Sequence, residues 1–595
     1  MKELTSYYKT ELQKYKKLLK QASKRSSLYL YSKLLFFTIT IVCVCLWFFY
    51  DAKSDFTAIG GIISIILYSI MVYLDNKEID KEEKYRRIIT TLEKEISNLK
   101  GNYTSNNGGE YISCAHPFTY DIDIFGEKSL FHCINRTVTH EGADRLAEIL
   151  SDIGSGKETV RRRQEAIKEL EGLADYRLQH MSVQKTEEKF LESISKLRSC
   201  SINTSLLKWL IVLSWALTIG NIVYLVTCLT LGTSTMLPIS IMACILFFNG
   251  SISVLYLSKG NHVIRKLKYL IQLSQCYSPI VSLNCNKTFE SELLKEIQSA
   301  LLLQKKYLQD LKSMNEIMNF RNNYILWFIT NTSIVLDLVV LYRFVKWEKK
   351  NIPTLSALLE NIGHLDALIS LASFNFNHPR TSQPEMTDEG FAGHNIYHPL
   401  MLSENVIGND YTQEESGISI ITGANMSGKS TFLRAVALNI VLANAGCNVC
   451  ATSFKFNPAI KLFTSMRTQD NITKGMSYFN VEIDRLSHAI DYSARHPHTL
   501  LILDEVLKGT NSEDKLEGSL KLLRFFSERS IMVIIATHDL GITKLEESFG
   551  EKKYKNYCFE IELTTPINYT YQISRGICKN KNASYIICNM LKSKK

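Results

Sequence analysis

The sequence lacks the cysteine patterns that bind metals or cross-link small secreted domains. Its 14 cysteines are scattered, and several lie inside apolar runs. One C-x-x-C pair, Cys447 and Cys450, has neither a second pair nor a nearby histidine to complete a metal site. We therefore predict reduced thiols in a cytosolic or lipid environment.

We also expect no cleavable signal peptide. Residues 1–33 are lysine-rich and amphipathic, and the apolar run after them has no small-residue cleavage site. Nor is there a strong excess of one charge, since the formal net charge is +10 over 595 residues. That balance allows nucleic acid or anionic lipid as a partner and establishes neither. The length exceeds what one hydrophobic core supports, so we expect several structural units.

Charged residues are absent from three long stretches, and this absence favours membrane-spanning helices. Leu34–Tyr50, Phe56–Leu74 and Trp209–Ser258 contain no Asp, Glu, Lys or Arg. The first two have about the length that ~30 Å of hydrocarbon requires, and the third is long enough for two spans. We predict one transmembrane hairpin over 34–74 and a second over 206–258. A buried soluble hairpin is the alternative for the second, although soluble helices of this length normally carry a polar stripe.

The flanks of these stretches predict how they are oriented. Lysine and arginine are concentrated before Leu34, after Leu74 and after Ser258, whereas the turns between paired spans carry almost none. Because positive residues stay on the cytoplasmic side, both hairpins are expected to enter the membrane from the cytoplasm and to return to it. We predict a multi-pass protein of the cell (inner or plasma) membrane, in contact with the lipid bilayer through four transmembrane helices, with its large segments cytoplasmic.

A fifth apolar stretch, Tyr324–Tyr342, contains Asn331 and differs from the others because it also contains an acidic residue, Asp337. A membrane-embedded aspartate costs about 2.5–3.5 kcal/mol near the bilayer centre. An odd fifth span would also place the following segment on the opposite side of the membrane. We predict a buried helix outside the membrane here, with a further span as the alternative.

Residues 423–430 fit the pattern G-x-x-x-x-G-K-[ST] of a phosphate-binding loop. The glycines let backbone N–H groups turn toward phosphate, and the helix that begins near Lys429 directs its positive dipole end at the same oxygens. Lys429 is expected to neutralise the β- and γ-phosphates of ATP, and the Ser430 hydroxyl to ligate Mg²⁺. The predicted nucleotide-binding residues of this segment are Gly423, Ala424, Asn425, Met426, Ser427, Gly428, Lys429, Ser430 and Thr431.

Two further apolar runs, 499–504 and 531–537, end in polar residues that complete this chemistry. Asp504 can hold Mg²⁺ through water, and Glu505 is placed to orient or deprotonate the attacking water. His538 can reach the γ-phosphate, with a purely structural histidine as the alternative. We predict Glu505, His538 and Lys429 as catalytic residues, and Ser430 with Asp504 as ligands of Mg²⁺. From about residue 417, short β-branched runs alternate with helical patterns, which predicts a parallel α/β sheet.

These motifs resemble the ATPase domain of the MutS family. The segments that carry the resemblance are "TGANMSGKSTFLRAVALNIVLANAGCNVCA", "SYFNVEI", "LLILDEVLKGTNSED", "ATHD" and the C-terminal "YTYQISRGICKNKNASYIICNML". Upstream, 116–150 and 161–170 resemble the start of the family's helical core, and 360–374 with 398–400 resemble its junction with the ATPase domain. The likeness runs from about residue 113 to 592, and the second apolar hairpin interrupts it. Within the family, the chain is most similar to the membrane-anchored MutS-related subgroup.

The resemblance implies a homodimer with two composite ATP sites. Ser477, in "GMSYFNVEI", matches the family serine that reaches the γ-phosphate of the partner in trans. Composite sites would make dimer closure depend on ATP, so that bound phosphate acts as a switch between two states.

The sequence also departs from the family pattern. The mismatch-reading domain with its Phe-x-Glu wedge should precede the core, but a basic helix and an apolar hairpin occupy that place. Phe125-Gly126-Glu127 fits the spacing and lies inside the core motif, so we interpret it as coincidence. No β-rich stretch between 260 and 345 matches the DNA-gripping clamp. We also expect no C-terminal helix-turn-helix extension.

The predicted fold is an α/β P-loop ATPase domain plus an all-α core and lever domain, with transmembrane helical hairpins. We assign 1–33 to a basic amphipathic helix, 34–74 to hairpin 1, 75–112 to a helical arm and linker, 113–205 to the first part of the core, 206–258 to hairpin 2, 259–397 to the second part of the core with the lever, and 398–595 to the ATPase domain.

The predicted function is that of a membrane-anchored, Mg²⁺-dependent MutS-like ATPase. Its homodimer is switched by ATP and binds mismatched or structured DNA in a role related to mismatch repair. The alternative is an ATP-switched membrane scaffold that binds protein or lipid without DNA recognition. An ABC-type transporter would need an L-S-G-G-Q-type signature before Asp504, and the sequence has none.

Overall fold

The computed structural model describes residues 2–49, 55–185, 203–259, 261–319, 324–401, 406–467, 478–529, 531–562 and 568–578. The chain divides into two compact units. The first unit comprises Met1–Thr137, Ala143–Ser182 and Ala367–Lys595, and the second comprises Val138–Gly142 and Val183–Asp366.

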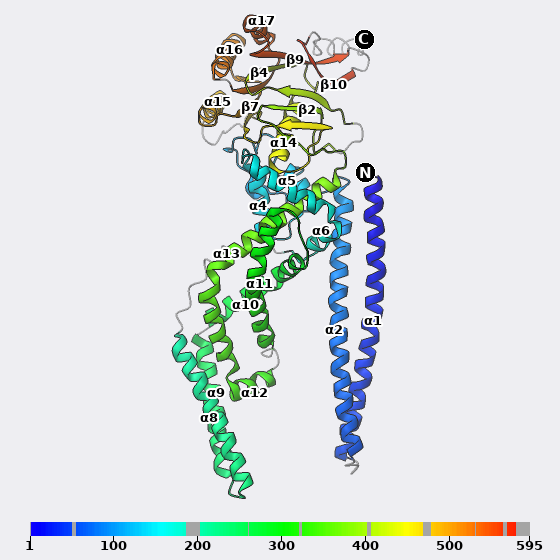
Figure 1. Ribbon diagram of the computed structural model, residues 1–595, viewed down its shortest axis with the longest axis vertical. Coiled ribbons are helices and arrows are strands. Elements are labelled where there is room, and N and C mark those ends of the chain that lie inside the picture. Colours follow the sequence, from blue (N-terminus) through cyan, green and yellow to red (C-terminus); the bar gives the residue numbers. More distant parts are fainter. Residues whose placement is uncertain are drawn as a thin grey trace, which may run out of the picture. The chain divides into compact units, whose positions relative to one another are not determined.

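The first unit begins with two long helices, α1 (Lys2–Phe49) and α2 (Asp55–Asn98), which run side by side in opposite directions (Figure 1). Each joins an apolar run to a charged arm without a break, and each is long and apolar enough to cross a membrane. Lys33 and Asp75, which flank the apolar runs, form an ion pair across the helices. Within the apolar part, the hydroxyl groups of Thr40 and Ser64 lie 2.7 Å apart. These polar contacts fix the alignment of the two helices.

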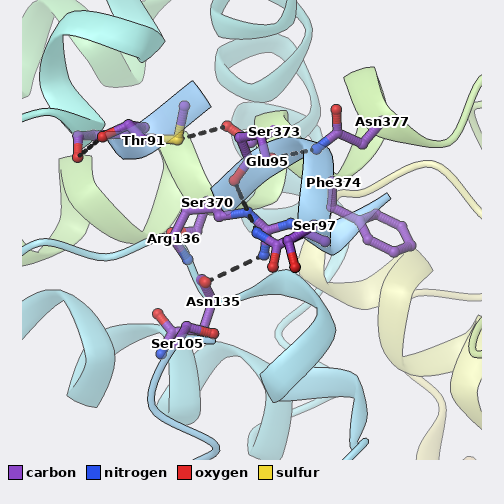
Figure 2. A network of polar contacts seen from close by, with 12 residues as sticks. Thr91, Glu95, Ser97, Ser105, Asn135, Arg136, Ser370, Ser373, Phe374 and Asn377 are labelled. Carbon is purple, nitrogen blue, oxygen red and sulfur yellow. Dashed lines mark hydrogen bonds and ion pairs between the residues drawn. The ribbon is translucent and has the colours of Figure 1, made fainter. Parts of the chain in front are cut away.

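A buried polar network holds the open ends of this helix pair. The Glu95 carboxylate of α2 lies 2.6 Å from Nε of Arg136, and Nδ2 of Asn377 donates to its other oxygen at 2.8 Å (Figure 2). Tyr8 of α1 donates its hydroxyl to Oδ1 of Asn377 at 2.8 Å. The network therefore joins α1, α2, the core loop around Arg136 and the last turn of the helix that precedes the C-terminal sheets.

Short helices build the core part of the first unit. They are η1 (Gly109–Tyr111), α3 (Leu130–Ile134), α4 (His140–Ser151), α5 (Lys157–Gly172) and α6 (Ala174–Met181). Asp121, from the loop before α3, accepts a hydrogen bond from Thr464 at 2.7 Å. Asp123 pairs with Arg434 and Arg467. These contacts attach the core loop to the C-terminal domain.

The C-terminal domain contains two sheets. The smaller has the order β1 (Glu385–Met386), β5 (Ser453–Phe456), β2 (Phe391–Ile396) and β3 (Asn409–Gln413). The larger has the order β10 (Asn568–Arg575), β9 (Tyr554–Glu562), β4 (Gly417–Gly423), β8 (Met532–Thr537), β7 (Thr499–Asp504) and β6 (Lys461–Ser465). All its neighbouring strands are parallel except β10, which is antiparallel to β9. The predicted parallel α/β sheet is confirmed, and its smaller companion begins upstream of residue 398.

Helices cover the larger sheet because its central strands are apolar on both faces. α14 (Lys429–Ala445) is almost wholly buried and contacts β4, β7 and β8. α15 (Tyr478–Arg495) and α16 (Ser512–Glu528) pack on the sheet through one cluster that includes Leu486, Leu501, Phe526 and Val533. The short helices η4 (Leu540–Thr543) and α17 (Lys544–Phe549) follow β8.

All regular elements in the described part of the second unit are helices. It contains α8 (Thr204–Thr230), α9 (Met236–Lys259), α10 (Asn261–Cys285), α11 (Glu292–Asn319), α12 (Tyr324–Ile334) and most of α13 (Leu336–Asn377). α8 and α9 are each long and apolar enough to span a membrane. Lys266 of α10 and Glu348 of α13 form a buried ion pair 2.5 Å apart.

The prediction of one buried helix over Tyr324–Tyr342 is wrong. The stretch divides into α12 and the start of α13, which meet at an angle of 76°. Val335, at the junction, has a φ of 47°, a backbone conformation that ends a right-handed helix. Among the described side chains of α12, Phe328, Ile329 and Ile334 are exposed.

Candidate functional site

The loop between β4 and α14 has the backbone shape of an anion-binding turn. Gly428, the residue before α14, has a φ of 109°, which favours glycine over any residue with a side chain. A Cβ on Gly423 would lie 2.8 Å from Oγ of Ser427 and 3.1 Å from the carbonyl oxygen of Phe559. Both glycines are therefore required by the path of the chain.

Lys429 is buried at the first turn of α14 and lies over this loop. Its Nζ donates to the carbonyl oxygens of Gly423 at 2.8 Å and Ala424 at 2.9 Å. Burial lowers the pKa of the Lys429 ammonium, against the opposing effect of Glu505 and Asp504. The charge is thus held close to the loop by weak, neutral partners that phosphate oxygens can replace.

The other residues of the loop divide into buried and exposed positions. Ser427 is buried, and among the described residues its Oγ has no hydrogen-bond partner. Asn425, Met426, Ser430 and Thr431 are exposed. An orphaned buried hydroxyl in a loop rich in N–H groups fits a polar ligand that completes its hydrogen bonding.

The carboxyl ends of three neighbouring strands meet at this loop. Thr422 of β4 is paired with Thr537 of β8, and Asp504 of β7 is paired with Ala536 of β8. The register therefore brings the loop, Asp504 and His538 to the same edge of the sheet. The sequence predicted this convergence.

Glu505 and His538 form a close pair beside Lys429. Oε1 of Glu505 lies 2.7 Å from Nε2 of His538, which is itself 3.4 Å from Nζ of Lys429. The hydrogen bond with His538 lowers the pKa of Glu505 to about 2, although partial burial acts in the opposite direction. Glu505 is in the left-handed region with a φ of 56°, and its N–H donates to the carbonyl of Ala536 at 2.9 Å. The carboxylate is thus fixed in place and ionised.

The donor set also fits Mg²⁺ bound together with a nucleotide. Among the described residues no three His, Cys, Asp or Glu side chains cluster as a metal site. A magnesium ion that takes most of its ligands from water and phosphate needs only one or two protein oxygens. Ser430 and Asp504, at the start of α14 and the end of β7, are the residues that would hold it.

A cavity of about 600 Å³ opens beside the start of α14. It is bounded by Gly428, Thr431 and Phe432 from the loop and helix, and by His398, Asn409, Phe559 and Tyr571 from other segments. Burial lowers the pKa of His398 to about 4, so this side chain is neutral near pH 7. The size and mixed lining suit a flat heteroaromatic group next to bound phosphates.

Sequence reasoning missed most of this cavity. Gly428 and Thr431 were predicted, and the "HPL" match at 398–400 and the C-terminal match from Tyr569 contain His398 and Tyr571, but no pattern in the sequence indicated that these segments meet Asn409 and Phe559 at one cavity. Ser477, predicted to act in trans, lies outside the described residues.

Comparison with known proteins agrees with the geometry. The family model "MutS domain V" matches residues 419–590. The DNA mismatch repair protein MutS of Acetivibrio thermocellus is 31% identical over 221 residues, which cover 36% of this chain and 25% of that protein. The DNA mismatch repair protein MutS of Caldicellulosiruptor bescii is 32% identical over 241 residues, which cover 38% of this chain and 27% of that protein. MutS protein homolog 4 of Mus musculus is 30% identical over 249 residues, which cover 39% of this chain and 25% of that protein. The chain thus spans about a quarter of the length of these curated relatives.

Proposed function

We propose that this chain is a membrane-anchored ATPase of the MutS type whose homodimer is switched by ATP, because the family model "MutS domain V" matches its residues 419–590. The observation that carries the proposal is the meeting of Lys429 with the Glu505–His538 pair at the ends of adjacent strands. A loop that binds phosphate and a fixed carboxylate beside it are what hydrolysis of a nucleoside triphosphate requires.

The residues of the site divide the work of hydrolysis. The N–H groups of the loop and the N-terminus of α14 bind the phosphates, and Lys429 exchanges its two carbonyl partners for phosphate oxygens. Mg²⁺, when held by Ser430 and Asp504, supplies positive charge to the phosphates. Glu505 orients the attacking water and accepts its proton, while His538 positions Glu505 and reaches the γ-phosphate. The cavity beside Gly428 accepts the base.

Anchoring in the cell membrane is supported by four helices. α1, α2, α8 and α9 each contain an apolar stretch of sufficient length. Lys33 and Asp75 pair where the apolar runs of α1 and α2 end, and Lys208 and Lys259 stand near the corresponding ends of α8 and α9. Both hairpins would therefore keep their charged ends on the cytoplasmic side, with the core and nucleotide domain.

We propose DNA of mismatched or branched structure as the partner, because three of the relatives compared above are named for mismatch repair or as MutS homologues. One observation favours the alternative of a scaffold that binds protein or lipid. In the described residues of 261–377 all regular elements are helices, and no β-rich clamp is among them.

A DNA-binding experiment on the full chain in lipid nanodiscs distinguishes DNA recognition from the scaffold function. Fluorescence anisotropy with matched, mismatched and branched duplexes is recorded with and without ATP across a salt series. We expect binding that depends on nucleotide and on DNA structure. Binding that is independent of nucleotide and of DNA structure, and that is lost at high salt, would contradict DNA recognition and favour the scaffold function.

The dimer is tested separately through Ser477. If this serine reaches the ATP of the partner, Ser477→Ala weakens ATP-driven dimerisation while each protomer still binds nucleotide. Sedimentation that shows normal dimers of the variant with ATP would remove Ser477 from this role.

A further inference from the structure

The C-terminal end of α12 is bound to the apolar hairpin of α8 and α9. Nε1 of Trp215 donates to the carbonyl of Ile334 at 3.0 Å, and Nδ2 of Asn249 donates to the carbonyl of Thr332 at 2.9 Å. Oδ1 of Asn249 accepts from Ser214 at 2.8 Å, and Asn249 is fully buried. These side chains satisfy two carbonyls that a helix end leaves without partners. The contact is therefore a specific joint inside the second unit.

This joint lies well inside the apolar hairpin. Trp215 follows Lys208 by seven residues, and Asn249 precedes Lys259 by ten. At about 1.5 Å per residue, these positions are roughly 10–15 Å from the charged ends of α8 and α9. If those ends mark the membrane surface, the end of α12 lies within one leaflet.

The start of α13 returns over the same depth. From Leu336 to Arg343 the helix contains one acidic residue, Asp337, and then cationic residues follow. Seven residues rise by about 10 Å, which matches the depth of the joint. Asp337 is 5% exposed, accepts Nε1–H of Trp327 at 2.9 Å, and donates its own N–H to Asn331 at 2.9 Å. These bonds reduce the cost of a carboxyl group at this depth.

The exposed side chains of α12 are apolar. Phe328 is 63% exposed and Ile329 52%, and residues 324–334 contain no charged side chain. Trp209 and Leu213 on α8 are likewise exposed apolar residues. A surface of this kind, joined to two candidate spans and followed by cationic residues, suits acyl chains with headgroups above them.

We propose that α12 and the first two turns of α13 form a re-entrant membrane segment, which enters and leaves on the cytoplasmic side. Phe328 and Ile329 then contact acyl chains of that leaflet. The proposal rests on the proposed membrane anchoring by α8 and α9. A re-entrant segment does not place the following residues on the opposite side of the membrane, as a fifth span would. It also means that α13, which continues to Asn377 before the C-terminal sheets, begins in the bilayer.

Photocrosslinking of the full chain in phosphatidylethanolamine–phosphatidylglycerol vesicles tests lipid contact. p-Benzoylphenylalanine is placed singly at Phe328, at Phe247 of α9, or at Phe549 of the nucleotide domain, all of which are exposed aromatic positions. After irradiation, mass spectrometry detects lipid adducts. We expect adducts at 328 and 247 and none at 549. An adduct at 247 without one at 328 overturns the re-entrant segment alone, whereas no adduct at either position overturns the membrane hairpin and the proposed anchoring with it.

Lysine labelling distinguishes a re-entrant segment from a fifth span. Lys306 of α11 and Lys349 of α13 are exposed residues on either side of α12. A membrane-impermeant amine reagent, applied to inside-out vesicles, is expected to modify both. Modification of only one of the two overturns the proposal, because a span would place them on opposite sides.

Discussion

Oε1 of Glu505 lies 2.7 Å from Nε2 of His538, and the two residues follow the neighbouring parallel strands β7 and β8. The pair places an ionised carboxylate next to the phosphate-binding loop. Since Glu505 is expected to accept the proton of the attacking water, Glu505→Gln should reduce kcat by about 10²- to 10⁴-fold with ATP affinity retained. Steady-state phosphate release and equilibrium nucleotide binding measure the two effects. An unchanged kcat would remove Glu505 from its role.

His538 sets the ionisation of Glu505, so its removal should change the pH profile. The hydrogen bond with His538 is the main cause of the low pKa of Glu505, about 2 against an ordinary 4.5. In His538→Ala that pKa rises, and Glu505 is protonated at higher pH than in the native protein. We expect the ratio of native to variant kcat to grow as pH falls from 7 toward 4.5. His394→Ala, at an exposed histidine of β2, is the control, and a constant ratio for His538→Ala would contradict the assignment.

The conformation of Gly428 should be essential for nucleotide binding. Alanine at this position must adopt a φ of 109°, and its Cβ would lie 3.2 Å from the ring of Tyr571. Strain of about 1–3 kcal/mol corresponds to roughly 5- to 150-fold weaker ATP binding, which isothermal titration can measure. Gly172→Ala is the matched control, because an added Cβ there meets nothing within 4 Å. Equal ATP affinity in both variants would show that the loop does not bind phosphate.

The buried Glu95–Arg136 pair should contribute strongly to stability. Glu95→Gln leaves the Arg136 guanidinium buried without its counter-charge, which typically costs about 3–5 kcal/mol. Denaturant unfolding of the detergent-solubilised protein measures the loss. Glu517→Gln, which breaks an exposed pair with Lys521, should have no measurable effect. If the two variants unfold alike, the network in Figure 2 does not stabilise the junction of α1, α2 and α13.

Acid should destabilise the protein through the partly buried His378. Burial lowers the pKa of His378 from 6.5 to about 4, and its ring stacks on Phe374. Because the pKa is lower in the folded state, His378 binds its proton more readily when unfolded. Its contribution is complete above pH 6.5 and is lost as pH falls toward 4, by at most about 3 kcal/mol. His378→Gln should flatten the pH dependence of unfolding across that window, and an unchanged slope would exclude His378 as a cause.

The parts predicted from sequence are those fixed by local spacing. Gly423, Gly428 and Lys429 act within one loop, and the apolar runs before Glu505 and His538 predict strands whose ends must meet in a parallel sheet. The charge-free runs likewise predicted the long apolar helices. Local pattern is sufficient in these cases because the determining residues are neighbours in the chain.

The parts that sequence did not predict depend on contacts between distant residues. Trp215 donates to the carbonyl of Ile334, and Asn249 donates to the carbonyl of Thr332. These bonds accompany the break between α12 and α13, which the apolar periodicity of the sequence does not mark. The cavity beside Gly428 likewise needs Phe559 and Tyr571 from the far end of the chain.

ATP hydrolysis by the purified full chain in nanodiscs, with Mg²⁺, tests the nucleotide site most directly when it is compared with the Lys429→Ala variant. We expect steady release of phosphate by the native protein and release at the background rate by the variant. Absence of turnover in the native protein, or equal turnover in both, would contradict the assignment of this site as an ATPase centre.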